Sequence, residues 1–267
     1  MDGLIALAAL MLAAAPHGHA AALDTSRIEL LTGAKGKLDR VAGVFKVSVP
    51  RTDLALTVGG VKLTSPSGLT SWAAFEPIGA EVMVMGDMVL TEAQVNPVMS
   101  TALENGLEVT ALHNHFLGES PRVMFMHIGG SGSVEQLAGA LGKVFASIKE
   151  PGAPLPRADI DPAQTQLATD KLETILGHRG DLSGGVYKVT IGRTARMHGH
   201  PIGSTMGVNT WAAFSGTNDQ AVVDGDFAMI ESELQPVLKA LRHADIQIVA
   251  IHQHMTGEEP RIMFLHY

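Results

Sequence analysis

A histidine pattern that occurs twice, 139 residues apart, constrains this chain more than any other feature. Each copy reads His-x-His, then eleven residues, then a third His. The histidines are His113, His115 and His127 in the first copy, and His252, His254 and His266 in the second. Because the pattern occurs twice, we expect a fold with two similar arrangements of three histidines.

The duplication extends well beyond the histidines. The segment Trp72–His127 aligns without a gap to Trp211–His266, with 20 identities in 56 positions. Solenoids need at least about three repeats, so two copies favour similar halves related by pseudo-two-fold symmetry. We expect repeat 1 at residues 28–149, a Pro- and Ala-rich linker at 150–167 and repeat 2 at 168–267.

Alternating and helical patterns within each half predict an α+β fold. In repeat 1, strands are expected at 45–49, 71–75, 81–85, 107–116 and 122–128, and helices at 91–105 and 133–149. Each half is therefore predicted to be a mixed, mostly antiparallel sheet with one or two helices. No counterpart of the helix at 133–149 follows in repeat 2. We therefore expect part of its sheet to lack cover, or to be covered by a second subunit in a homodimer or by a short N-terminal helix around Ile28–Leu31.

The net charge and the N-terminal segment indicate which partners and which location to expect. The net charge is −8 and no basic cluster exceeds two residues, which argues against nucleic acid, because phosphate binding needs clustered Lys and Arg. Residues 1–22 are typical of a secretory signal peptide, with a short apolar run at Leu4–Ala15, although a buried apolar helix is the alternative. We expect a periplasmic or secreted protein with no membrane attachment after cleavage. The chain has no cysteine, which excludes disulfides and thiolate ligands.

The three histidines of each copy are predicted to bind a metal ion. Side chains alternate along a strand, so His113 and His115 should share one face with Val109, and His127 should meet them from the next strand. Three imidazoles brought together suit a zinc-like ion, with a fourth position for water or substrate. Copper is the alternative metal, given 13 methionines. The competing interpretation is a set of core histidines that bond to the backbone.

Charged residues beside the histidines are candidates for chemistry. Glu119 and Glu258 lie in the predicted turn and are candidate catalytic acids or bases, metal ligands or solvated turn residues. Arg122 and Arg261 either clamp a substrate carboxylate or pair with the preceding Glu.

Two further pairs receive a structural interpretation. Trp72 and Trp211 are expected to be core anchors rather than a stacking platform. Asp87 and Asp226 each follow a Gly, which is typical of a turn.

The stretches ALHNHFLGESPRVMFMHIGG, AIHQHMTGEEPRIMFLHY, GVFKVSVPRTDL and GVNTWAAFSG resemble the LppY/LpqO family. The resemblance covers nearly all of the chain after residue 22 and implies an exported bacterial protein. Similar members usually continue past FLHY into a Gly-rich turn and a helix. The histidine pattern alone is also similar to the zinc site of acetolactate decarboxylase.

Two functions remain open from the sequence. The first is an exported metalloenzyme that acts on a small, carboxylate-bearing molecule. The second is a non-catalytic metal-binding or buffering protein. A cleft that opens onto the metal position would favour the enzyme, and a fourth position filled by protein would favour the binding protein.

Overall fold

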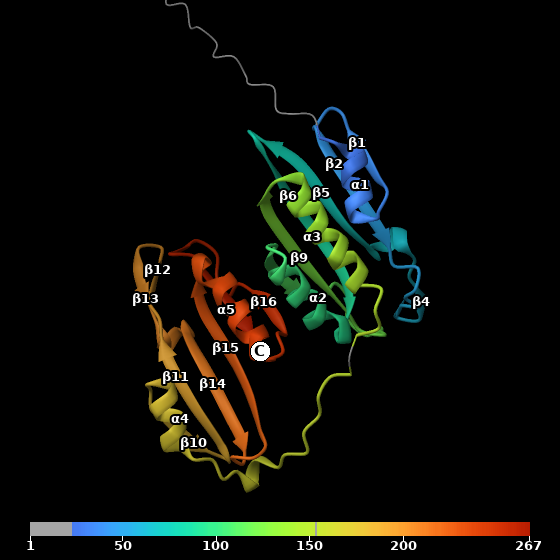
Figure 1. Cartoon of the computed structure of the whole chain (residues 1–267). Helices are drawn as coiled ribbons and strands as arrows, with labels where there is room; N and C mark the ends of the chain where they lie inside the picture. The colour runs from blue at the N-terminus through green and yellow to red at the C-terminus, as the bar shows by residue number, and fades with distance from the viewer. Residues whose placement is uncertain (1–22, 153) are drawn as a thin grey trace, which may run out of the picture.

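One continuous sheet runs through both repeats (Figure 1). The computed structural model describes residues 23–152 and 154–267. Twelve strands follow the order β1-β2-β5-β6-β9-β7-β16-β18-β15-β14-β11-β10. The second six mirror the first six, and neighbouring strands of this sheet are antiparallel. The predicted α+β fold of two tandem, pseudo-symmetric repeats is confirmed.

The elements of repeat 1 begin with a short helix and end with a long one. They are α1 (Thr25–Thr32), β1 (Gly36–Asp39), β2 (Val44–Pro50), β3 (Thr57–Val58), β4 (Val61–Lys62), β5 (Thr70–Ile78), β6 (Glu81–Thr91), α2 (Glu92–Glu104), β7 (Glu108–His113), β8 (Glu119–Ser120), β9 (Val123–Gly132) and α3 (Val134–Ser147). Strands β4, β3 and β8 form a small separate sheet.

Repeat 2 follows the same order as far as β18, the strand that corresponds to β9. Its elements are α4 (Thr169–Leu176), β10 (Gly180–Ser183), β11 (Val186–Gly192), β12 (Ala195–Met197), β13 (His200–Ile202), β14 (Asn209–Gly216), β15 (Ala221–Ile230), α5 (Glu231–His243), β16 (Ala250–His252), β17 (Glu258–Glu259) and β18 (Ile262–His266). Strands β13, β12 and β17 form the second small sheet. None of the helices between residues 23 and 267 is long and apolar enough to cross a membrane. The signal-peptide prediction concerns residues 1–22, which lie outside the described residues.

The two faces of the large sheet differ in what covers them. Helices α1, α2, α3 and α5 pack on one face, called here the helix face, over a core that both repeats share. The opposite face, called here the outer face, carries the two small sheets, each above its own apolar cluster. The remainder of the outer face, near the centre of the large sheet, holds the histidines.

Two side-chain amides join the repeats where β7 meets β16. The strands themselves pair at Leu112 and Ile251. Asn96 of α2 binds the backbone of Ile248: its Nδ2 donates to the carbonyl over 3.2 Å, and its Oδ1 accepts from the N–H over 2.7 Å. Gln235 of α5, at the equivalent position, binds both backbone groups of Val109 in the same way. Each helix thus braces the strand of the other repeat.

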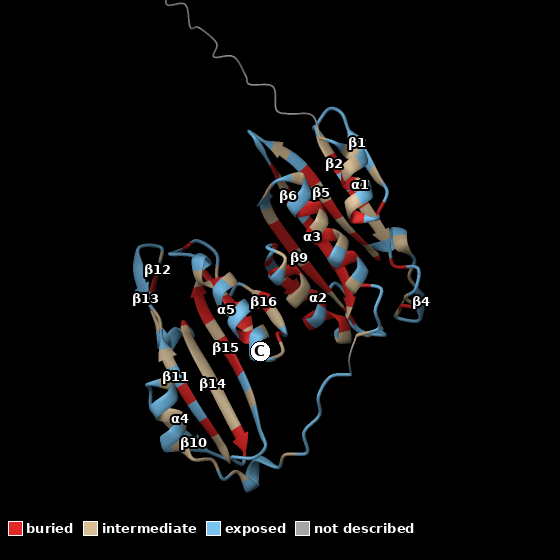
Figure 2. Cartoon of the chain, in the orientation of Figure 1, coloured by how far each residue is buried: buried red, intermediate tan, exposed pale blue. Residues whose placement is uncertain are grey.

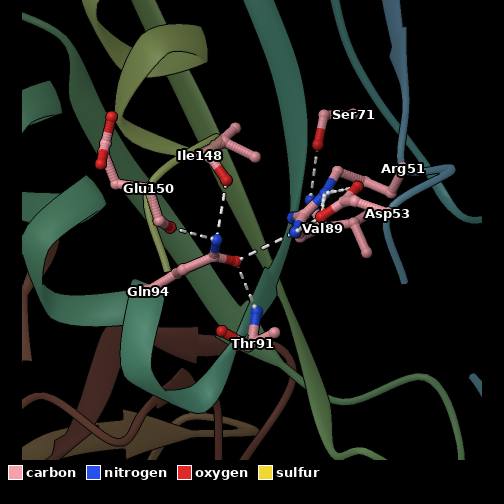
Figure 3. Close-up of polar contacts among 8 residues, drawn as sticks. All are labelled: Arg51, Asp53, Ser71, Val89, Thr91, Gln94, Ile148 and Glu150. Atoms are coloured by element: carbon pink, nitrogen blue, oxygen red, sulfur yellow. Dashed lines mark hydrogen bonds and ion pairs between the residues drawn. The ribbon is translucent and has the colours of Figure 1, made fainter. Parts of the chain in front are cut away.

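A buried polar network fixes the start of α2 in repeat 1 (Figure 3). The guanidinium of Arg51, which is 3% exposed, donates to the side chain of Gln94 over 3.2 Å and to the carboxylate of Asp53 over 2.8 Å. The amide nitrogen of Gln94 donates to the carbonyls of Ile148 and Glu150, just after α3, over 2.7 Å each. One amide therefore anchors α3 to α2.

The same position in repeat 2 holds an acid, and the chemistry changes accordingly. Glu233 binds Arg193 and accepts from the N–H of Ile230 over 3.0 Å. A carboxylate has no proton to donate to helix-terminal carbonyls. Glu233 therefore joins Arg193 to the start of α5.

The helix face of repeat 2 is less buried than that of repeat 1, and the N-terminal helix α1 packs on α3 and on β1 and β2 of repeat 1. In repeat 1, five residues beneath the helices are 2% exposed or less: Ala73, Phe75, Val84, Met88 and Ile128. The equivalent residues are only half-buried; they are Ala212, Phe214, Val223, Phe227 and Tyr267. Figure 2 shows the contrast between the buried residues of β5 and the mostly intermediate residues of β14.

Two glycines of α3 give opposite predictions for substitution by alanine. A Cβ on Gly142 would fall on the backbone carbonyl of Leu31 in α1, whereas a Cβ on Gly139 would meet nothing within 4 Å. Alanine normally stabilises a helix interior by about 0.5–1 kcal/mol relative to glycine. We expect Gly139→Ala to follow this rule and Gly142→Ala to lower the free energy of unfolding by about 1–3 kcal/mol. Urea denaturation measures both, and equal effects would contradict the close approach of α1 and α3.

Candidate metal centres

Strand pairing places the histidines of repeat 1 on the outer face. Strand β9 lies between β6 and β7, and His127 stands opposite Asp87 on one side and Ala111 on the other. His113 stands opposite Phe125. Paired residues of an antiparallel sheet point to the same face, so His113, His127 and Asp87 converge.

Repeat 2 reproduces this arrangement in register. His266 on β18 stands opposite Asp226 on β15 and Ala250 on β16, and His252 stands opposite Phe264. Each candidate metal site is therefore framed by one carboxylate and by imidazoles from two neighbouring strands and the loop that follows.

The second copy is the more closely gathered. His252, His254 and His266 each offer a nitrogen, and these three atoms lie within 4.8 Å of one another. Nε2 of His254 is 3.8 Å from Oδ2 of Asp226, whose other oxygen accepts from the N–H of Leu265 over 3.2 Å. This is a three-histidine set with a carboxylate at its side.

The first copy is similar but more open. The Nε2 atoms of His127 and His113 are 3.0 Å apart. The ring of His115 stacks on Phe125 with centroids 3.4 Å apart, and its centroid is 5.1 Å from that of His113. His254 stacks on Phe264 at the same 3.4 Å. A buried Phe thus supports the exposed loop histidine in each repeat.

Each centre contains a buried polar atom that has no partner among the described residues. These atoms are Oδ1 of Asp87 and Nδ1 of His252. Buried polar atoms are nearly always hydrogen-bonded, so an unpaired one needs an explanation, and a bound cation is one. Burial raises the pKa of Asp87 and of Asp226, against the attraction of the histidines around them.

Burial also acts on the imidazoles. It lowers the pKa of His115, His252 and His254, and so favours the neutral ring. The neutral imidazole is the form that binds metal ions.

The interpretation of Asp87 and Asp226 as turn residues is wrong. Strand β6 does not end at residue 85 but continues through Gly86 and Asp87 to Thr91, and the two carboxylates are 8% and 4% exposed. Sequence reasoning therefore missed the residues that complete each centre. The signal was present, since Gly-Asp occurs in both copies at the same distance from the histidines.

Two details of the predicted strand are also wrong. A bulge at Thr110 shifts the alternation, so Val109 points to the helix face and not to the face of His113. Strand β7 ends at His113, so His115 lies in the following loop. The same holds for His254 after β16. The loop histidines reach the centre through stacking and not through strand geometry.

The candidate catalytic residues of the two repeats lie in different surroundings. Glu119 and Arg122 line a cleft of about 730 Å³ together with His113 and His252. Arg122 pairs with Glu92 over 3.6 Å and not with Glu119. This cleft lies beside the β7–β16 junction and is otherwise largely apolar, with residues such as Phe116 and Leu117.

The equivalent residues of repeat 2 are placed differently. Glu258 is 6% exposed, and its Oε1 accepts from the N–H of Ile262 over 3.0 Å, so it closes the turn. Arg261 lines a separate cleft of about 940 Å³ that no histidine lines. Of these two clefts, the one with Glu119 and Arg122 is lined by histidines, and these come from both repeats, His113 from the first and His252 from the second.

The two tryptophans are not core anchors. Trp72 and Trp211 are half-buried on the outer face, opposite Asp87 and Asp226 respectively. A lysine ammonium covers each ring: Lys46 Nζ lies 3.7 Å from the ring centroid of Trp72, and Lys188 Nζ lies 4.1 Å from that of Trp211.

Fold and site together define a duplicated α+β protein with a three-histidine, one-carboxylate cluster on each repeat. The profile of the family described as Domain of Unknown Function (DUF1259) matches residues 26–147 and 170–267. The chain belongs to this family, and the two matched segments correspond to its two repeats. No curated protein and no solved structure matches the chain. The resemblance to the LppY/LpqO family stays a prediction.

Proposed function

We propose that this chain is an exported protein that binds two zinc-like divalent ions, one on each repeat, and that repeat 1 acts as a metalloenzyme on a small carboxylate-bearing molecule. The observation that carries the proposal is the gathering of three imidazole nitrogens within 4.8 Å in repeat 2, repeated in register in repeat 1. Three histidines with an open or carboxylate-filled fourth position are a usual zinc environment.

The cleft in repeat 1 favours a reaction over simple storage. It brings His113 together with Glu119 and Arg122, which supply an acid or base and a cation for a carboxylate. A bound zinc-like ion would add Lewis-acid polarisation of a carbonyl or carboxylate oxygen. The apolar walls limit the access of water and strengthen these interactions.

A second function, metal binding without catalysis, is favoured in repeat 2. Asp226 lies 3.8 Å from His254 and is positioned to fill the fourth position. A centre with all four ligands from the protein is typical of structural sites. Repeat 1 would then have an open centre that catalyses a reaction, and repeat 2 would have a closed centre that only binds metal.

Metal content of the purified protein tests the proposal. We expect two equivalents of zinc by elemental analysis after dialysis against a zinc-containing buffer. His115→Ala and His254→Ala should each remove about one equivalent, because each deletes one of three ligands. Both histidines are exposed, so truncation leaves the core intact.

The control is His198→Ala, which changes an exposed histidine of the β12–β13 turn and should retain two equivalents. Unchanged metal content in the His115→Ala, His254→Ala double variant would refute the metal proposal. Binding of small carboxylates to the wild type but not to Arg122→Gln would support the enzyme over the storage function.

A further inference from the structure

The outer face holds a row of polar side chains that leads away from each metal centre. In repeat 1, His127, Asp87 and Trp72 stand side by side on β9, β6 and β5. Lys46, on the same face of β2, reaches back over the Trp72 ring. Repeat 2 has the same row, namely His266, Asp226, Trp211 and Lys188.

The two repeats can be compared residue by residue along this row and along the rest of the outer face. The outer-face residues of the row are identical in both copies, including Lys46 and Lys188 on the exposed end. The small residues in register with the row, Ala74 and Ala213, are also identical. Outer-face residues further along β5 and β6 differ: Glu76, Met83 and Met85 correspond to Ser215, Val222 and Asp224. A requirement of the fold alone does not explain why an exposed Lys is kept while residues further along the strands change.

The lysines are available to a ligand. Both are exposed, and neither makes an ion pair within the part of the chain that the structure describes. A cation over a tryptophan face gains about 0.5–1 kcal/mol at an exposed site, which restricts the ammonium without neutralising it. Trp72 thus holds Lys46 on the side of the metal centre.

We propose that Lys46 and Lys188 bind the carboxylate of a small anionic molecule whose other end meets the metal centre of the same repeat, with Trp72 and Trp211 as positioning residues. The inference rests on the proposed function and adds a further carboxylate-binding cation: Arg122 lines the cleft beside His113, whereas Lys46 lies over Trp72 on the outer face. Arg122 does not have this role in the row, because it lies on the turn before β9 and pairs with Glu92.

The sheet sets the length of the ligand. Trp72 is two strands from His127, a separation of about 10 Å at the usual strand spacing. An extended eight-carbon diacid such as suberate has a span on the order of 10 Å. Suberate is therefore a suitable probe, with adipate and succinate as shorter members of the series and acetate as the single-headed control.

Intrinsic fluorescence gives a direct readout, because Trp72 and Trp211 are the only tryptophans in the chain. In a Trp211→Phe background, Trp72 alone reports on repeat 1. We expect suberate to shift its emission with a saturable midpoint in the zinc-loaded protein. Lys46→Met should raise that midpoint about tenfold or more, and Lys46→Arg should largely restore it. The matched control is Lys62→Met, an exposed lysine on β4, which should leave the midpoint unchanged.

The outcomes separate this inference from the proposed function. If zinc binds but Lys46→Met leaves the midpoint unchanged, or if no diacid gives a saturable shift, the inference is refuted and the metal centres stand. A fall in melting temperature with an unchanged midpoint would show that the Lys–Trp pair is only structural and would also overturn it. If zinc does not bind but carboxylates still shift the emission in a Lys46-dependent way, the anion site is supported and the metal proposal is refuted.

Discussion

Replacing Asp226 by Asn is expected to weaken metal binding by repeat 2 by about 10- to 100-fold. The carboxylate lies 3.8 Å from His254 and is almost fully buried, so its charge acts on a bound cation with little screening. Asparagine keeps the shape and the bond from the Leu265 N–H but removes the charge. The affinity is measured by competition with a chelator in a His115→Ala background, which leaves only the repeat 2 centre.

The matched control is Asp224→Asn, an exposed acid two residues earlier on β15 and on the same face. It should change the affinity by less than about threefold, since solvent screens an exposed charge. The metal-free Asp226→Asn protein should unfold at an equal or higher temperature, because a buried charge without its counterion costs stability. Wild-type affinity in Asp226→Asn would remove this residue from the centre.

Replacing Asn96 by Ala is expected to cost about 2–4 kcal/mol of unfolding free energy, the largest stability effect of any substitution considered. Asn96 is 4% exposed and satisfies both backbone groups of Ile248 in the other repeat. Alanine would leave a buried N–H and a buried C=O unpaired, at about 1–3 kcal/mol each. Urea denaturation measures the loss.

Gln235→Ala is the internal control, since Gln235 makes the same two bonds to Val109 but is only half-buried. Water can replace the lost partner there, so we expect a smaller cost than for Asn96→Ala. A cost below about 0.5 kcal/mol for Asn96→Ala would mean that the β7–β16 junction does not depend on this amide. Faster proteolysis of the linker in the Asn96→Ala variant would locate the damage at the junction between the repeats.

The duplication and the periodic helices were predictable because both are local patterns. An apolar stripe predicts α3, and four of its five residues are buried while Val134 is half-buried; the stripe is Val134, Leu137, Leu141, Val144 and Phe145. The face shared by His113 and His127 also follows from alternation together with an antiparallel hairpin. The fold class and the histidine sets could therefore be read from the sequence.

The remainder of each centre depended on tertiary context. Gly-Asp favours a turn, and acids are disfavoured in strands, so nothing local places Asp87 in the middle of β6. On the adjacent strand β9, Asp87 is paired with His127, which lies forty residues later in the sequence. The contact with this histidine explains why an acid occupies the position. The bulge at Thr110 could not be predicted either, because an alternating pattern does not show where a strand contains one extra residue.

The continuous sheet has a consequence for how two ions could cooperate. The first histidine set lies between β9 and β7 and the second between β16 and β18, so the two sets are about two strand spacings, or roughly 10 Å, apart across the sheet. The Leu112–Ile251 pairing and the amides of Asn96 and Gln235 join the two halves at this separation. Co-catalytic metal pairs that share one bridging oxygen lie about 3.5–4 Å apart. The sheet therefore works as a rigid spacer that forbids a dinuclear cluster. Two paramagnetic ions loaded into this protein should give the spectrum of isolated centres, with no exchange coupling between them.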